Sequence, residues 1–452
     1  MKKLLLITCL FLPALAYAQQ GQTGVNGLSF IAPLQLAGGG DNGFLVDRTN
    51  PNERLLVLSL PPSLQTAAPN ILPQRLSDNV FTVRLPKAAF VNDSRRHEFT
   101  ATYVPEFEVF RKNGDQNAMN QQATGLFRYF FARNAEFSVS DVYRSSHDPA
   151  RTLENVFLLL PRSPYSENAV RASFDFQPNR VTSFGVQYDY ARTNFGQTDP
   201  FQVRILDSAS AGYSFMGTRM LTRTQRVRFT YSIFKITAIN PHNKFEDQVD
   251  TNYSFEQPMH SGMVEYRVSP TPGTVVELAA GLIKMNTGLN YTFRVGGDKR
   301  IGSYFWVGGG YSRSLSFQTA ASAPVAAGLN SNGFYDVFTA RFKGQTTRKT
   351  AVLFDMSISR GVASPLIDSS KSFMGRARFD YRLGDREVLF TSLESFNQNN
   401  NAYVRAPLSR NRLMVGFEIS LSSETDRRLN HSNEDAEYVA LTDHQRRNTK
   451  PQ

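Results

Sequence analysis

Apolar and polar residues alternate along most of the chain with a period of two. In the stretch VRASFDFQPNRVTSFGVQYDYART (170–193), valine, phenylalanine and tyrosine alternate with polar residues such as Arg171, Asp175 and Asp189, on both sides of a Gln-Pro-Asn-Arg turn at 177–180. Successive side chains of a β-strand point to opposite faces, so the stretch predicts a hairpin with one apolar and one polar face. The apolar face could meet the core of a soluble β-protein or the lipid of a membrane.

Segments of this kind recur between residues 97 and 422, and we count about sixteen of them. Many extend to roughly ten residues, the length that a tilted strand needs to cross a bilayer, whereas strands of soluble proteins usually have about 5–6. Short turns and longer loops alternate between the segments, as is typical of outer-membrane barrels. The segments lie at 99–109, 127–131, 137–143, 170–176, 184–190, 209–215, 227–233, 262–268, 276–282, 291–295, 304–311, 338–342, 352–358, 373–381, 388–396 and 413–421.

These features predict an all-β fold, a transmembrane up-and-down antiparallel β-barrel of about 16 strands. A sheet in lipid must close, because an open edge would leave backbone donors and acceptors without partners. After residue 18 no apolar stretch approaches about 18 residues in length, so the sequence predicts no transmembrane helix. A soluble all-β protein is the alternative fold.

The two ends of the chain depart from the alternation. Residues 1–18 begin with two lysines, continue with a short apolar run and end in Ala-Tyr-Ala, which predicts a secretory signal peptide. Residues 19–96 contain a triglycine, many prolines and few long alternations, which predicts an N-terminal periplasmic extension or plug. The barrel then covers 97–422, and the polar residues 423–452 are expected to form a C-terminal tail.

The last predicted strand carries a more specific pattern. From Met414 onward it matches polar-x-Gly-x-x-apolar-x-apolar at Gly416, Ile419 and Leu421, although Met414 is not polar. With this strand, the region 97–422 resembles the bacterial outer-membrane β-barrels and porins. The resemblance implies an outer-membrane location in a Gram-negative cell envelope, contact with outer-membrane lipid, and assembly by the barrel-assembly machinery through this signal. Many members of that family end at their final strand with an aromatic residue, whereas this chain continues.

If the apolar residues face lipid, the alternate residues face the lumen. An arginine on the lipid side would cost about 2–4 kcal/mol at the bilayer midplane, so the charged set is expected inside. Arginines there would favour anions or hydroxylated solutes, while the structural alternative is that arginine–carboxylate pairs only brace the wall. The candidates for lining the lumen are Arg128, Arg171, Asp175, Asp189, Arg226, Arg228, Arg267, Arg294, Arg376 and Arg378.

Composition and motifs exclude several other functions. The formal net charge of +11 comes from arginines scattered through the segments rather than from a basic tract, so nucleic acid is not expected as a partner. The six histidines form no close metal-binding pair, and the single cysteine, Cys9, lies in the predicted signal peptide. The dipeptide His260-Ser261 is the only suggestion of a catalytic pair. We therefore expect no catalytic residues, no metal and no cofactor, and the protein is not expected to be an enzyme.

The function predicted from the sequence is a porin-like channel for passive diffusion of small hydrophilic solutes across the outer membrane. The alternative is a non-conducting barrel that anchors or serves an envelope or polysaccharide-export complex. The sequence leaves the solute, a homo-oligomeric state and the role of residues 19–96 open.

Overall fold

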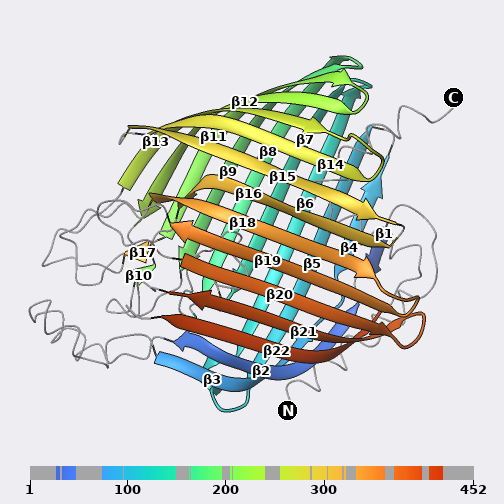
Figure 1. Cartoon of the computed structure of the whole chain (residues 1–452), viewed down its shortest axis with the longest axis vertical. Helices are drawn as coiled ribbons and strands as arrows, with labels where there is room; N and C mark the ends of the chain where they lie inside the picture. Colours follow the sequence, from blue (N-terminus) through green and yellow to red (C-terminus); the bar gives the residue numbers. More distant parts are fainter. Residues whose placement is uncertain are drawn as a thin grey trace, which may run out of the picture.

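Twenty strands of the computed structural model form one sheet that closes on itself as an antiparallel barrel (Figure 1). Strand β1 continues β2, and β4 continues β3, so the strands fill 18 positions in the wall. The structure describes residues 27–30, 33–46, 74–94, 96–148, 162, 164–195, 204–205, 207–239, 255–285, 288–302, 304–317, 320–321, 332–361, 371–399 and 407–420.

The wall strands run from 11 residues in β3 to 16 residues in β11, long enough to cross a bilayer at a tilt. They are β2 (Leu34–Val46), β3 (Gln74–Arg84), β5 (His97–Phe110), β6 (Ala118–Ala132), β7 (Ala135–Ser146), β8 (Tyr165–Asn179), β9 (Thr182–Phe195), β11 (Asp207–Thr222), β12 (Gln225–Ile239), β13 (Phe255–Val268), β14 (Thr274–Met285), β15 (Gly288–Ile301), β16 (Phe305–Phe317), β18 (Asn332–Gln345), β19 (Thr350–Gly361), β20 (Lys371–Arg382), β21 (Glu387–Gln398) and β22 (Leu408–Ile419).

The remaining elements are short. Strands β1 (Gly27–Phe30) and β4 (Ala88–Asp93) pair with each other, and β4 extends the wall beside β5. Strand β10 (Arg204–Ile205) pairs with β17 (Ala320–Ala321) outside the main sheet, and one 3-10 turn, η2 (Gly114–Gln116), follows β5. Within the described ranges no helix is both long and apolar enough to cross a membrane.

Wall strands pair with their neighbours in the sequence, and the barrel closes where β22 meets β2. Residues 34–42 of β2 run antiparallel to residues 419–411 of β22. Every segment predicted from the alternation is a wall strand, and two further wall positions come from the region before residue 97. The predicted all-β, up-and-down antiparallel barrel is therefore confirmed, with 18 strands in place of about 16.

The prediction that residues 19–96 form a periplasmic extension or plug is wrong for the described part of that region, because β2 and β3 are wall strands. Gly38-Gly39-Gly40 in β2 provides no alternating apolar side chains. In addition, this sector turns apolar side chains such as Phe44 and Val80 inward, at depths where strands such as β8 and β9 carry polar ones. The pattern that reveals the other strands is therefore missing here. The predicted signal peptide (1–18) and tail (423–452) lie outside the described residues.

The two faces of the wall differ as the hairpin pattern predicts. Along most strands, large apolar side chains on the outward face are between 36% and 66% exposed, among them Phe174, Phe184 and Val186 of the β8–β9 hairpin. Since folded water-soluble proteins rarely leave so large an apolar surface uncovered, this belt is the lipid-facing surface. The turn of the hairpin is at residues 180–181 rather than 177–180, because β8 continues to Asn179 through an irregular register.

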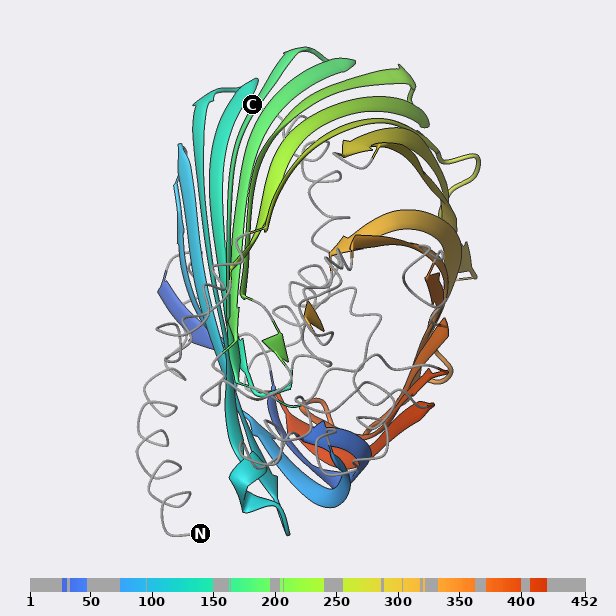
Figure 2. The ribbon, with the colours of Figure 1, turned by 90° about the vertical axis from the view of Figure 1, so that its left-hand side faces the viewer.

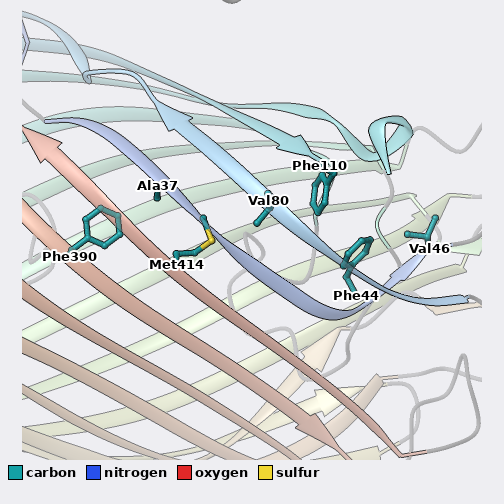
Figure 3. Packing of buried hydrophobic residues seen from close by; sticks show 7 residues of the cluster. All are labelled: Ala37, Phe44, Val46, Val80, Phe110, Phe390 and Met414. Carbon is teal, nitrogen blue, oxygen red and sulfur yellow. The ribbon is translucent and has the colours of Figure 1, made fainter. Parts of the chain in front are cut away.

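An apolar cluster lies inside the barrel where the first and last strands meet. Its buried members are Ala37, Phe44, Val46, Val80, Phe110, Phe390 and Met414, contributed by β2, β3, β5, β21 and β22 (Figure 3). The rings of Phe44 and Phe110 lie 5.3 Å apart. This packing stabilises, from the interior, the junction of β2 and β22 where the barrel closes, which we call the seam.

Two glycines allow β2 to pack closely against β22 at this seam. A Cβ atom on Gly39 would lie 1.8 Å from the carbonyl oxygen of Leu413, so no side chain fits there. Gly43 adopts φ +90°, which favours glycine, at the register shift between Asn42 and Phe44. The shift turns Phe44 into the apolar cluster.

Candidate functional site in the barrel interior

Ion pairs that skip strands identify the interior face of the wall. Arg378 Nη2 of β20 lies 2.5 Å from Glu418 Oε1 of β22, across β21. Arg412 Nη1 of β22 lies 2.9 Å from Glu108 Oε1 of β5, across both β2 and β3. Neighbouring strands are about 4.8 Å apart, so such side chains meet only on the concave side of the sheet. Figure 2 looks into the ring that this side encloses.

The structure places all ten predicted lumen residues on this concave face and pairs most of them across strands. Arg171 Nε lies 2.7 Å from Asp189 Oδ1, and Arg267 Nη1 lies 3.2 Å from Glu277 Oε1. Asp175 accepts a hydrogen bond from the Ser173 hydroxyl at 3.3 Å. Among the others, Arg128 pairs with Glu98 and Glu136, Arg376 with Glu394, and Arg378 with Asp380 and Glu418.

One part of the interior wall has more arginines than carboxylates. We call it the basic patch, and it comprises Arg226, Arg228, Arg267 and Arg294 with Glu265 and Glu277, on β12 to β15. Glu265 accepts from both Arg226 Nη2 (3.2 Å) and Arg294 Nη2 (2.8 Å). The buried Nε atoms of Arg226 and Arg228 have no hydrogen-bond acceptor among the described residues. Around Arg376 and Arg378, by contrast, the two arginines pair with three carboxylates, Glu394, Asp380 and Glu418.

A second set of charges is almost completely buried. This ion cluster consists of Asp41, Glu108, Asp148, Arg162, Arg410 and Arg412, whose side chains are 0–6% exposed. Arg410 Nη2 bridges Asp41 Oδ2 (2.7 Å) and Asp148 Oδ2 (2.6 Å). Three arginines and three carboxylates cancel in charge. This balance is required, because burying an unpaired ion costs several kcal/mol.

The ion cluster fastens the chain that follows β7 to the interior wall. Arg162 binds Asp148 (Nη1 to Oδ2, 3.0 Å) and Glu108 (Nη2 to Oε2, 3.1 Å), and its backbone N–H donates to the carbonyl oxygen of Leu45 at 2.8 Å. Its guanidinium also lies 4.7 Å from the centre of the Phe110 ring. The charges therefore rest on the apolar cluster, and the two clusters form one packed unit that joins β2, β5 and β22 to the connection between β7 and β8.

His147 lies at the edge of the ion cluster. Burial lowers the pKa of its imidazole, and the positive charge of Arg162 lowers it further, while Glu108 acts in the opposite direction. The buried Nδ1 has no hydrogen-bond partner among the described residues, and the backbone N–H donates to Asn120 Oδ1 at 3.3 Å. This environment keeps the ring neutral near neutral pH.

Sequence reasoning did not identify the ion cluster as a site. Arg410 and Arg412 are two residues apart at the start of the last strand, and this spacing alone could have indicated a shared inward face. Asp41 lies in a strand that the alternation did not reveal, and Asp148 and Arg162 lie in a long connection without periodicity. Their convergence arises only from the closure of the barrel.

The proposed assembly signal lies partly in the closing strand. Gly416 faces inward, where a Cβ atom would lie 2.4 Å from Phe390 Cζ, so this glycine is required for packing. Ile419 pairs with Leu34 at the seam, and Leu421 lies outside the described residues.

The described residues show where the suggested catalytic pair lies. His260 and Ser261 point to opposite faces of β13, with the His260 ring 3.0 Å from the Tyr231 hydroxyl, so the suggested catalytic pair does not form. Within the described ranges no three His, Cys, Asp or Glu side chains are grouped to hold a metal ion.

No family model and no curated protein matches the chain. Among solved structures, the chain is similar to the siderophore receptor PirA from Pseudomonas aeruginosa, with 9% identity over 88% of this chain and 81% of that one and a TM-score of 0.41. It is also similar to Pseudomonas aeruginosa OpdQ, with 8% identity over 86% of this chain and 97% of that one and a TM-score of 0.43.

A third similar structure is the Pseudomonas aeruginosa ferric enterobactin receptor PfeA in complex with BCV-L6. It has 8% identity over 86% of this chain and 74% of that one and a TM-score of 0.45. The assignment of this chain follows from its own fold, which combines a closed antiparallel barrel, an apolar outward belt and a charged interior. The chain is an outer-membrane β-barrel protein embedded in outer-membrane lipid.

Proposed function

We propose that the protein is a porin-like channel through which small hydrophilic solutes diffuse passively across the outer membrane. The supporting observation is the ring of charged and hydroxyl side chains on the concave face of an 18-position wall. Barrels of about 16–18 strands are wide enough to leave an aqueous channel, whereas about eight strands are filled by their own side chains. Paired charges on the wall keep such a channel wetted.

The basic patch gives this channel a preference for anionic solutes. The arginines of the patch outnumber its carboxylates by two, since Arg226, Arg228, Arg267 and Arg294 lie beside Glu265 and Glu277. Arg294 is 48% exposed, so its guanidinium can contact a passing solute. A carboxylate or phosphate group could accept hydrogen bonds from this exposed guanidinium.

Solute entry into liposomes tests the proposal. The full-length protein is reconstituted and swelling is followed in a neutral sugar, a sugar acid and an amino sugar of similar size. We expect swelling in all three, fastest with the sugar acid, and Arg228→Gln should reduce that preference. Arg376→Gln, which removes the same charge where carboxylates are in excess, should leave it intact. Absence of swelling in every solute would contradict the channel and favour a non-conducting barrel that serves an envelope or polysaccharide-export complex.

We also propose that the last strand is read by the barrel-assembly machinery and that the protein acts in transport rather than as an enzyme. The position of Ile419 beside Leu34 at the closing seam supports the first point. Ile419→Asp should reduce the amount of folded protein in the outer membrane, measured by heat-modifiable gel migration. Since Gly416 also has a packing role, a change at Gly416 would not separate recognition from stability.

A further inference from the structure

A row of charged side chains lies on the outward face of the barrel near the rim with the longer connections. We call it the rim row, and it comprises Arg313, Asp336, Arg360 and Lys371 on the adjacent strands β16, β18, β19 and β20. Each residue is paired in register with the next, so neighbours in the row have Cα atoms about 4.5–5.5 Å apart. For Arg360 and Lys371 the outward direction follows from the inward positions of their neighbours, since Ser359 and Ser372 are hydrogen-bonded and buried on the interior face. For Arg313 it follows from the contact of its guanidinium with the exposed ring of Tyr291.

The rim row contains three cations and one carboxylate, Asp336. This carboxylate forms an ion pair with Arg313. Arg313 Nε lies 3.9 Å from Asp336 Oδ1, which also accepts a hydrogen bond from the Tyr311 hydroxyl at 2.8 Å. The Arg313 guanidinium further lies over the Tyr291 ring, 4.4 Å from its centre. No carboxylate of the described residues forms an ion pair with Arg360 or Lys371, and both are exposed.

Arg360 and Lys371 are directly opposite each other across β19 and β20. Like charges at directly opposed positions destabilise a strand pair. On a surface at the level of the membrane interface, an anion between the two side chains would turn this repulsion into attraction. The arrangement therefore has the chemistry of a site for a phosphate group.

The next row toward the membrane is entirely apolar or aromatic. Two residues deeper on the same four strands lie Tyr311, Phe338, Ile358 and Phe373, again paired in register. Phe338 is 54% exposed and Ile358 is 43% exposed, so the row offers an open apolar surface. Two residues along a strand correspond to about 7 Å, which places the cations just above the acyl-chain region.

We propose that the rim row binds the phosphate group of a phosphorylated lipid of the outer leaflet, whose acyl chains lie on Phe338 and Ile358. The cations supply charge-assisted hydrogen bonds to the headgroup. The exposed apolar row provides the contact that a free phosphate ion would not use. The occupant is therefore a membrane lipid rather than a soluble anion, and the site is separate from the solute pathway inside the barrel.

Native mass spectrometry of the full-length protein released from phosphatidylcholine nanodiscs containing diphosphoryl lipid A tests this assignment. We expect wild-type protein to retain lipid A, and Arg360→Gln with Lys371→Gln to retain about tenfold less. Arg360→Lys should retain most of the binding. The matched control is Arg192→Gln with Lys284→Gln, which removes two exposed cations from outward positions outside the rim row. An equal loss in the control, or no loss in the test variant, would overturn the proposal.

Thermal unfolding gives a second readout that a merely structural role would not produce. In phosphatidylcholine alone, the double variant at 360 and 371 should be at least as stable as wild type, because it lacks the repulsion between opposed cations. With lipid A present, wild type should become the more stable of the two. Lower stability of the variant without lipid A would refute the inference. Displacement of lipid A by inorganic phosphate would show a free-anion site and refute the lipid as occupant.

Discussion

Replacing Arg410 with methionine should destabilise the barrel far more than removing a comparable arginine elsewhere on the interior wall. Arg410 is 6% exposed, and its guanidinium contacts Asp41 and Asp148, whose side chains are 0–1% exposed. Without it, the ion cluster has three carboxylates and two arginines, a net charge of −1 with little access to water. Breaking a buried pair in this way typically costs about 3–5 kcal/mol.

Arg171→Met is the matched control. Its ion pair with Asp189 is as short, at 2.7 Å, but the two side chains are 62% and 40% exposed. Exposed pairs contribute about 0–1 kcal/mol, so the two substitutions should differ by at least about 2 kcal/mol. Both changes remove one interior arginine, and the difference comes from burial and from the number of partners, because Arg410 contacts two carboxylates and Arg171 contacts one.

The assay is urea unfolding of full-length protein folded in phosphatidylcholine vesicles, followed by the fluorescence of Trp306, the only tryptophan of the chain. Adding Asp148→Asn to Arg410→Met restores a balanced cluster of two arginines and two carboxylates, and we expect it to recover part of the loss. If Arg410→Met costs no more than Arg171→Met, or if the double variant loses the sum of both changes, the cluster is not the buried, charge-balanced unit described above.

Three further outcomes are expected. The pKa of His147 is lowered below its usual 6.5, so on acidification the unfolded chain binds the proton first. The contribution of His147 to the free energy of unfolding is therefore fully present above pH 6.5 and falls as the pH drops below it. Unfolding free energies measured between pH 8 and 5 should show this slope, and His147→Gln should remove it. Phe174→Arg, which places a charge on the lipid side at about 2–4 kcal/mol, should reduce heat-modifiable folded protein, and Gln187→Arg should not; equal tolerance would contradict the orientation of the hairpin. Gly39→Ala should prevent closure at the seam, whereas Gly40→Ala, with no atom within 4 Å of the new Cβ, should fold normally; gel migration distinguishes the two.

The lipid-facing strands could be predicted because their two faces meet different surroundings. In β8 and β9 an apolar residue follows a polar one with little interruption, and lipid and water enforce that alternation along the whole strand. The same physical cause makes β2 and β3 hard to recognise. There the interior carries Phe44 and Val80, so both faces are partly apolar and the period of two fades. Residues 34–46 and 74–84 are assigned to the wall by their pairing in the closed sheet of the structure.

The interior residues could be predicted as a class but not as partners. Alternation places Arg226 and Arg376 on the polar face, yet it does not indicate that carboxylates are scarce near the first and plentiful near the second. Partner choice depends on the strand register and on contacts that skip strands, such as that of Arg378 with Glu418. The ion cluster is the extreme case, because Asp41 and Arg410 are 369 positions apart in sequence and adjacent in space.

Single-channel recording in planar lipid bilayers tests the central claim most directly. The full-length protein should insert in discrete steps of conductance that scale with the salt concentration, as expected for a water-filled lumen lined by charged side chains. Under a salt gradient the reversal potential should indicate a preference for anions, and Arg228→Gln should reduce that preference. A barrel that folds by gel migration but shows no conductance steps at any voltage would contradict the account.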